Sequence, residues 1–188
     1  MASACRAASR WRAGWPRISV DPLSDCAKRV GSKNVHAYEA NPELIPLIRG
    51  TYARNEVAPI LVNALLAQGE GERDFRLAGE FWAPSAHRSD GAKTIKVRQV
   101  DLNTELARIR PSFLIVDIEG GEAEFFASAN LQSVRKICVE THADVLGDRV
   151  LSEMFSALVA QGVALDFSLI RKNVFFLSRY RLAEELGP

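Results

Sequence analysis

The 188-residue chain has few of the residues that build disulfide frameworks or metal centres. It contains three cysteines and three histidines, which lie far apart in the sequence and include no C-x-x-C pair. This scatter argues against a disulfide-stabilised scaffold and a structural zinc site, so we expect no bound metal. Unpaired cysteines are typical of the reducing cytoplasm, where we expect the protein to act. Cys138 lies in an apolar run, which predicts a buried and unreactive thiol.

The chain also lacks an excess of charge of either sign and any long apolar run. Lys plus Arg total 24 and Asp plus Glu total 23, so the composition does not favour binding to nucleic acid. Apolar runs such as Phe113–Val116 fall far short of the roughly 18 residues that a membrane span needs, and we expect none. Hydrophobic residues make up 47% of the chain, which is enough to build the core of one globular domain.

Residues 1–20 differ in composition from the rest of the chain. They carry no acid, whereas arginines occur at Arg6, Arg10, Arg12 and Arg17. An arginine-rich and serine-rich start without acids is typical of a transit peptide, and the alternative is a start that is not native to the domain. We therefore set 1–20 apart as a basic segment, disordered or non-native, and assign 21–188 to a single domain.

From residue 34 onward, the hydrophobic patterns of strands and helices alternate. Strands are expected at 34–39, 58–65, 74–77, 94–100, 113–118, 136–140, 163–170 and 174–178, and helices at 41–55, 102–109, 121–128 and 149–161. Because only 171–173 separate the last two strands, these must pair as an antiparallel hairpin. The order predicts an α/β domain with a Rossmann-like, doubly wound, mostly parallel sheet that ends in this hairpin. Residues 79–93 have no clear period and predict a loop, in which Trp82 and His87 are candidate contacts to a small-molecule substrate.

Ligands of such sheets bind beyond the carboxyl ends of the strands, so the side chains there are the candidate site residues. Glu39 ends the first clear strand, and a carboxylate there accepts both hydroxyl protons of a ribose. The alternative is a solvated acid beside a helix N-terminus. Asn63 and Ala64 end the next strand and offer a flat surface for a base.

The segment Asp117–Glu122, with the sequence D-I-E-G-G-E, comes directly after the most hydrophobic strand. Asp117 and Glu119 share one side if the extended geometry continues, and the two glycines allow a ligand to approach the backbone. The alternative is that Asp117 only caps the next helix. His142 lies just beyond the strand at 136–140 and is either a base that works near neutral pH or an ordinary surface histidine.

Four segments together resemble the FkbM family of S-adenosylmethionine-dependent methyltransferases in order and spacing. They are VHAYEANPEL at 35–44, VNA at 62–64, FLIVDIEGGE at 113–122 and VETH at 139–142. The resemblance implies the class I methyltransferase fold, S-adenosylmethionine as cofactor, and a hydroxyl group of a sugar or another small natural product as acceptor. It also implies that Glu39 holds the ribose, that Asn63 and Ala64 lie along the adenine, and that Asp117 lies near the methionine part or the reacting methyl group. Asp117, Glu119 and His142 are then the candidate bases.

The chain departs from this family pattern at its start. The fold normally opens with a strand and a G-x-G turn, but the only glycines before Val35 are Gly14 and Gly31. The opening strand is therefore expected to be missing, as in an N-terminally truncated domain, or replaced by Ile18–Pro22. Two alternatives stay open: an inactive remnant that acts as a binding protein, and an NAD-dependent oxidoreductase, because Glu39 also suits NAD. The oligomeric state is left open.

Overall fold

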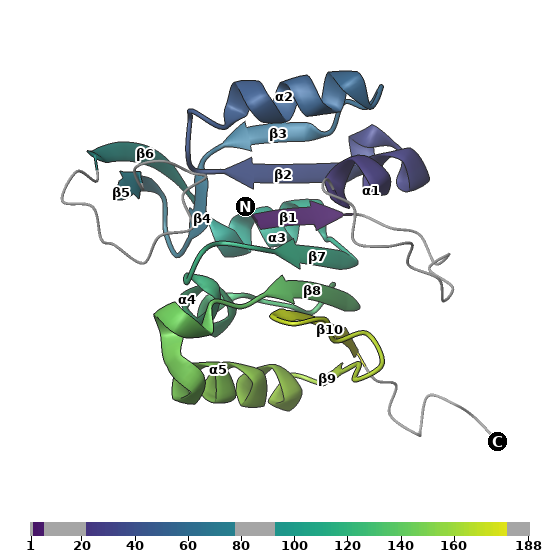
Figure 1. The fold of residues 1–188 in the computed structure, drawn as a ribbon, viewed down its shortest axis with the longest axis vertical. Helices are drawn as coiled ribbons and strands as arrows, with labels where there is room; N and C mark the ends of the chain where they lie inside the picture. Colours follow the sequence, from purple (N-terminus) through teal and green to yellow (C-terminus); the bar gives the residue numbers. More distant parts are fainter. Residues whose placement is uncertain (1, 6–21, 78–92, 180–188) are drawn as a thin grey trace.

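The computed structural model describes residues 2–5, 22–77 and 93–179 (Figure 1). The elements in chain order are β1 (Ala2–Cys5), α1 (Pro22–Val30), η1 (Ser32–Asn34), β2 (Val35–Glu39), α2 (Ile45–Arg54), β3 (Ile60–Asn63), β4 (Leu65–Ala67), β5 (Gly71–Leu77), β6 (Lys93–Asp101), α3 (Leu102–Ile109), β7 (Phe113–Val116), α4 (Glu122–Ser128), β8 (Lys136–Glu140), α5 (Ala143–Ala160), β9 (Val163–Leu165) and β10 (Val174–Arg179). The expected α/β class is confirmed. The main sheet has seven strands in the order β3-β2-β1-β7-β8-β10-β9, and a second sheet has the order β4-β6-β5.

The main sheet is mixed in direction, and the expectation of mostly parallel pairing is wrong: four of its six strand pairs are antiparallel, because β1 and β10 each run opposite to both neighbours. The pairs β2/β3 and β7/β8 are parallel, whereas β1 is antiparallel to β2 and β7. At the other end of the sheet β10 is antiparallel to β8 and β9, which confirms the expected C-terminal hairpin. The strands β2, β3, β7 and β8 therefore all end at one edge of the sheet, which we call the carboxyl edge; it lies to the left in Figure 1.

The place of the opening strand, between β2 and β7, is filled by Ala2–Cys5 and not by Ile18–Pro22. Pro22 instead begins α1, and 18–21 lie outside the described residues. Cys5 pairs with Val35 and Phe113, the first residues of their strands, so β1 leaves the sheet at the edge opposite the carboxyl edge. A strand in this place satisfies the backbone N–H and C=O groups of both neighbours, which an open gap would leave without partners inside the sheet.

Helices pack on both faces of the main sheet. Side chains of β2, β7 and β8 alternate between the faces, as the pleat requires. One face packs against α1 and α2 and carries Val35, Ala37, Phe113, Ile115 and Cys138. The other packs against α3, α4 and α5 and carries Tyr38, Leu114, Val116, Ile137 and Val139. Cys138 is only partly buried, not fully buried as expected, but burial still raises its pKa to about 12, as expected for an unreactive thiol.

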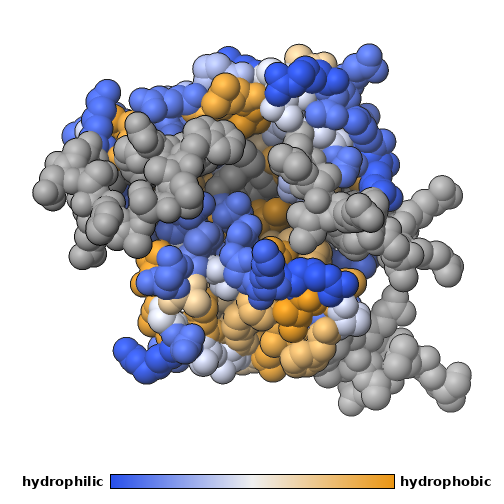
Figure 2. Space-filling model, viewed as in Figure 1, coloured by the Kyte–Doolittle hydropathy of each residue, from blue (hydrophilic) through white to orange (hydrophobic). Residues whose placement is uncertain are grey.

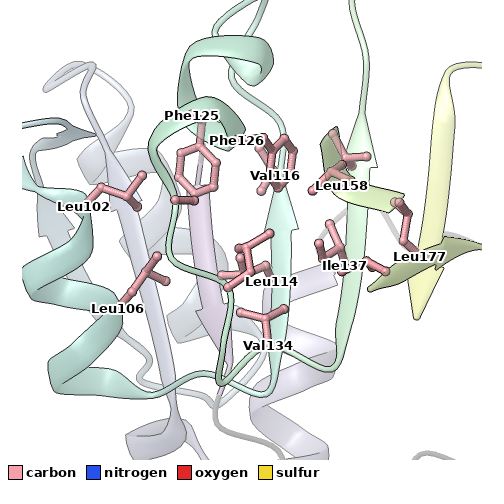
Figure 3. Packing of buried hydrophobic residues seen from close by; sticks show 14 of the residues in the cluster. Leu102, Leu106, Leu114, Val116, Phe125, Phe126, Val134, Ile137, Leu158 and Leu177 are labelled. Carbon is pink, nitrogen blue, oxygen red and sulfur yellow. The ribbon is translucent and has the colours of Figure 1, made fainter. Parts of the chain in front are cut away.

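The larger core lies on the face of α3, α4 and α5. Leu102 and Leu106 of α3 point toward the sheet, beside Phe125 of α4, while Leu158 of α5 lies over β8 (Figure 3). On α5, Leu151, Met154 and Leu158 form the buried stripe that the sequence predicts.

The view in Figure 2 looks onto the opposite face, where hydrophobic residues gather in the half of the molecule that contains β8, β10 and β9.

Several expected boundaries are wrong, for local reasons. Helix α2 begins at Ile45 rather than Asn41, because the Asn41 side chain accepts the Glu43 N–H in a tight turn. Helix α5 begins at Ala143 rather than 149, with a kink at Gly147, where φ is 77°. Strand β9 ends at Leu165, because Asp166 starts a turn by accepting the Ser168 N–H.

The second sheet comes directly after β3 and lies beyond the carboxyl edge of the main sheet in Figure 1. Arg73 of β5 pairs with Glu124 of α4 at 2.7 Å, which ties the second sheet to the first helix after β7. Most of the expected loop at 79–93, including Trp82 and His87, lies outside the described residues. Among the helices that the structure describes, none combines the length and hydropathy that crossing a bilayer requires.

Candidate functional site

The strand register places Glu39 and Asp117 level with each other at the carboxyl edge. Ala2 of β1 pairs with Tyr38 on one side and with Val116 on the other. Glu39 and Asp117 are the next residues after these two, so they are separated by two strand spacings, or about 10 Å. A ligand that both acids contact requires them to share one edge of the sheet, and the register gives this arrangement.

Glu39 is buried at the end of β2, with only 7% of its surface exposed. One carboxylate oxygen, Oε1, accepts the backbone N–H of Asn41 at 2.7 Å, which orients the side chain toward the turn after β2. Asn63, at the end of β3, donates its amide N–H to the backbone carbonyls of Glu39 and Ala40. Asn63 therefore clamps the ends of β2 and β3 together, and Ala64 beside it is buried in the larger core.

The residue before Glu39 anchors helix α3 to the end of β2. The Tyr38 hydroxyl donates a hydrogen bond to Glu105 and accepts one from Arg108 at 3.3 Å. Burial and the neighbouring Glu105 raise the pKa of Tyr38, so its hydroxyl stays protonated at physiological pH. Glu105 in turn pairs with Arg108 at 2.6 Å. This network has a structural role, because it holds the strand end that carries Glu39.

At the ends of β7 and β8, four side chains converge on one point. We call Asp117, Glu119, Glu122 and His142 the acid–histidine cluster. His142 lies between two glutamates: its Nδ1 is 2.7 Å from Glu122 Oε1, and its Nε2 is 3.0 Å from Glu119 Oε2. One oxygen or nitrogen atom from each of Asp117, Glu119 and His142 lies within 4.8 Å of the other two. The three candidate bases thus form a single site.

Burial differs sharply within this cluster. Glu122 has no exposed surface, whereas the Glu119 side chain is 76% exposed. Burial lowers the pKa of His142, but the hydrogen bond to Glu122 and the charges of Glu119 and Glu122 outweigh it, so the pKa is raised overall. Burial, reinforced by the Glu119 charge, raises the pKa of Asp117. The cluster thus combines one imidazole with three carboxyl groups, of which one is fully buried and another is largely exposed.

The turn between β7 and α4 depends on unusual backbone angles. Glu119 has φ 51° and Gly120 has φ 100°, and at the second of these angles L side chains are rare. The Gly120 N–H donates to Glu122 Oε1 at 3.1 Å, so the turn folds back over the buried acid. A Cβ atom on Gly120 would lie 2.6 Å from the Cγ1 atom of Val145, which is closer than van der Waals contact allows.

Replacing Gly120 with Ala is expected to lower the free energy of unfolding by about 1–3 kcal/mol from backbone strain, with the Val145 clash in addition. Urea denaturation of both proteins measures this difference. Gly69→Ala is the matched control, because Gly69 also has a positive φ, 83°, but a Cβ there meets no atom within 4 Å. If Gly120→Ala is no more destabilising than Gly69→Ala, the turn does not need the close approach of Val145.

The sequence pattern predicts neither the role of Glu122 nor the contact of His142 with the acids. Glu122 belongs to the D-I-E-G-G-E segment, but no signal marked it as the most buried of its acids. His142 is 20 residues farther along the chain. The signal that was available is the parallel order of β7 and β8, because residues just beyond two adjacent parallel strands meet at one edge. Asp117, Glu119 and His142 offer ligand atoms within 4.8 Å of one another, a grouping that the scattered histidines of the sequence do not predict.

Comparison with protein families identifies one domain in the chain. Residues 19–161 match a family model described as "Methyltransferase FkbM domain". The matched region runs from just before α1 to the end of α5, and it contains Glu39, Asn63 and all four members of the acid–histidine cluster. Comparisons with curated proteins and with solved structures give no significant match.

Proposed function

The chain belongs to the family of FkbM-domain methyltransferases, and from this membership we propose that it is an S-adenosylmethionine-dependent O-methyltransferase. Its proposed acceptor is a hydroxyl group of a sugar or of another small natural product. In the same proposal, α1 and α2 on one face and α3, α4 and α5 on the other form the Rossmann-like, doubly wound arrangement of the class I methyltransferase fold. We propose that it acts in the cytoplasm.

The observation that carries the proposal is the level placement of Glu39 and Asp117 at the carboxyl edge. The side chains present there fit an adenosine-bearing group, because a carboxylate at the end of β2 accepts ribose hydroxyls with strong, charge-assisted hydrogen bonds. Asn63, at the end of the neighbouring β3, would lie along the adenine, whereas Ala64 is buried in the larger core and offers little surface to it. Asp117, two strands away, would lie near the methionine part or the methyl group.

When bound, S-adenosylmethionine supplies a methyl group that its sulfonium already activates for displacement. The residues of the chain then have two tasks: to align the acceptor hydroxyl with the methyl group and to accept the hydroxyl proton. In this proposal Asp117, Glu119 and His142 would lie where the proton is released, and His142 Nε2 and Glu119 Oε2, 3.0 Å apart, are close enough to pass a proton between them. We assign the base to this group rather than to one of its members.

A second candidate function, a binding protein without catalysis, is favoured by the direction of β1. Because β1 runs opposite to β2 and β7, its last residue, Cys5, lies at the edge of the sheet away from Glu39 and Asp117. A glycine-rich turn after this strand would therefore lie at the wrong edge to contact a cofactor at the carboxyl edge. In this alternative the chain keeps the fold of the family, but no glycine-rich turn contacts the methionine part of the cofactor.

Calorimetric titration of the full chain with S-adenosylmethionine and, separately, with NAD tests the proposal. We expect saturable binding of S-adenosylmethionine with one site per chain and no binding of NAD. Methyl-labelled cofactor and a panel of small sugars then detect transfer to a hydroxyl group. Binding of neither cofactor would favour the non-catalytic binding protein, and binding of NAD alone would replace the proposal with an oxidoreductase.

A further inference from the structure

The acid–histidine cluster brings together ligand types that bind metals, from two separate parts of the chain. Asp117 and Glu119 lie just beyond β7, and His142 lies just beyond β8. Their ligand atoms lie within 4.8 Å of one another, and the His142 Nε2 to Glu119 Oε2 distance is 3.0 Å. In an octahedral site with bonds of about 2.1 Å, neighbouring ligands are about 3.0 Å apart and opposite ligands about 4.2 Å apart. The distance between His142 and Glu119 therefore matches neighbouring ligands of one cation, and the 4.8 Å limit places Asp117 close enough to join them after a small side-chain shift.

Glu122 provides a second, independent observation that points to a cation. It has no exposed surface, and its Oε2 atom has no hydrogen-bond partner within the described part of the chain. Its other oxygen lies 2.7 Å from His142 Nδ1, so the carboxylate faces the cluster. A buried carboxylate that is not fully satisfied is unfavourable unless positive charge lies nearby.

The contact between Glu122 and His142 is also the arrangement that prepares a histidine for metal binding. A carboxylate on Nδ1 holds the ring proton there, which leaves the lone pair on Nε2 free to bind a metal. Nε2 is the atom that faces Glu119. Because Glu119 is 76% exposed, the remaining coordination positions of an ion would face solvent and a ligand.

We infer that Asp117, Glu119 and His142 bind one divalent transition-metal cation of the Mn²⁺ type, with Glu122 as the positioning residue for His142. Two carboxylates and one imidazole suit first-row transition cations better than Mg²⁺ or Ca²⁺, which prefer oxygen ligands only. The role of the ion rests on the proposed function: its open positions would bind the acceptor oxygen and ease the loss of the hydroxyl proton to solvent, in place of direct transfer to the three liganding side chains. Its binding does not depend on that function.

Titration of the chelator-treated full chain with Mn²⁺, monitored by the loss of the free-Mn²⁺ electron paramagnetic resonance signal, tests the inference. We expect one ion per chain, which an equal concentration of Mg²⁺ does not displace. Glu119→Gln should weaken Mn²⁺ binding by at least about 10-fold, in keeping with the effect of changing even indirect partners of a metal. Pulsed spectra of the bound ion should show coupling to one imidazole nitrogen, which His142→Ala removes.

Glu124→Gln is the matched control, because Glu124 is a similarly exposed glutamate (62%) of α4 that pairs with Arg73 outside the cluster. It should bind Mn²⁺ like the unchanged chain. If the unchanged chain binds no Mn²⁺, or if Glu119→Gln and Glu124→Gln bind it equally, the cation site is refuted. In that case a proton on His142 takes the place of the ion in the cluster.

Titration of the same samples with S-adenosylmethionine separates the two proposals. Mn²⁺ binding without cofactor binding refutes only the methyltransferase, and cofactor binding without Mn²⁺ binding refutes only the cation site.

Discussion

Replacing Glu39 with Gln is expected to weaken S-adenosylmethionine binding by about 2–3 kcal/mol, or about 30- to 150-fold, because the charge that accepts the ribose hydroxyls is lost. Gln keeps the shape of the side chain and a carbonyl oxygen that still accepts the Asn41 N–H. The turn after β2 should therefore be retained. Calorimetric titration of both proteins measures the change in affinity, and their thermal unfolding shows whether the fold is intact.

Glu43→Gln is the control for this result. Glu43 is an exposed glutamate in the same turn, where its backbone N–H donates to the Asn41 side chain. The substitution makes the same chemical change close to the site, and we expect an affinity within about two-fold of the unchanged chain, as for an exposed charge. Equal affinities of Glu39→Gln and the unchanged chain would show that the ribose lies elsewhere.

The second large effect concerns the core that supports the carboxyl edge. Leu158 of α5 is fully buried among residues of the larger core, which also contains Ile137 of β8 and Leu177 of β10 (Figure 3). Leu158→Ala is expected to lower the free energy of unfolding by about 2–5 kcal/mol, because it removes buried methyl groups and leaves a cavity. Urea denaturation monitored by circular dichroism measures the loss.

Val159→Ala serves as the comparison for the core substitution, since Val159 is the next residue of α5 and is 45% exposed. Its truncation removes little buried surface and should change the free energy of unfolding by less than about 1 kcal/mol. The interpretation of α5 as a helix with one buried stripe fails if the two substitutions destabilise the chain equally.

The reversed strand β1 links the fold to the choice between enzyme and binding protein. A central strand that runs antiparallel satisfies its neighbours' hydrogen bonds as well as a parallel one, so the sheet itself does not depend on its direction. The direction of β1 matters only for the loop after the strand, because it decides at which edge of the sheet that loop emerges. Stability and cofactor binding are therefore separate questions in this chain, and the titrations address the second.

Local patterns in the sequence were sufficient for much of the fold. The helix at 102–109 and the strand at 136–140 were predicted with the bounds that the structure has, because each has a clear hydrophobic period. For the helix, Asp101 adds a cap by accepting the Thr104 N–H. The start of α2 was missed because Pro42 fits a turn as well as the first position of a helix.

The sequence by itself determined which polar side chains lie near the strand ends: Glu39 and, just beyond β8, His142 at the predicted ends, and Asn63 and Asp117 within two residues of them. A strand end is a local property, set by where a hydrophobic run stops, so it can be read without coordinates. The family segments carry the same information, since they span these ends.

Only the tertiary structure decided what those side chains meet. The short run Ala2–Cys5 has no hydrophobic period of its own that would predict a strand. Its position is set by backbone pairing with β2 and β7. In the same way, the parallel pairing of β7 and β8 brings His142 between Glu119 and Glu122, and packing buries Glu122 completely. Pairing and burial depend on residues distant in sequence, and they set the distances and pKa values on which the chemistry of this site depends.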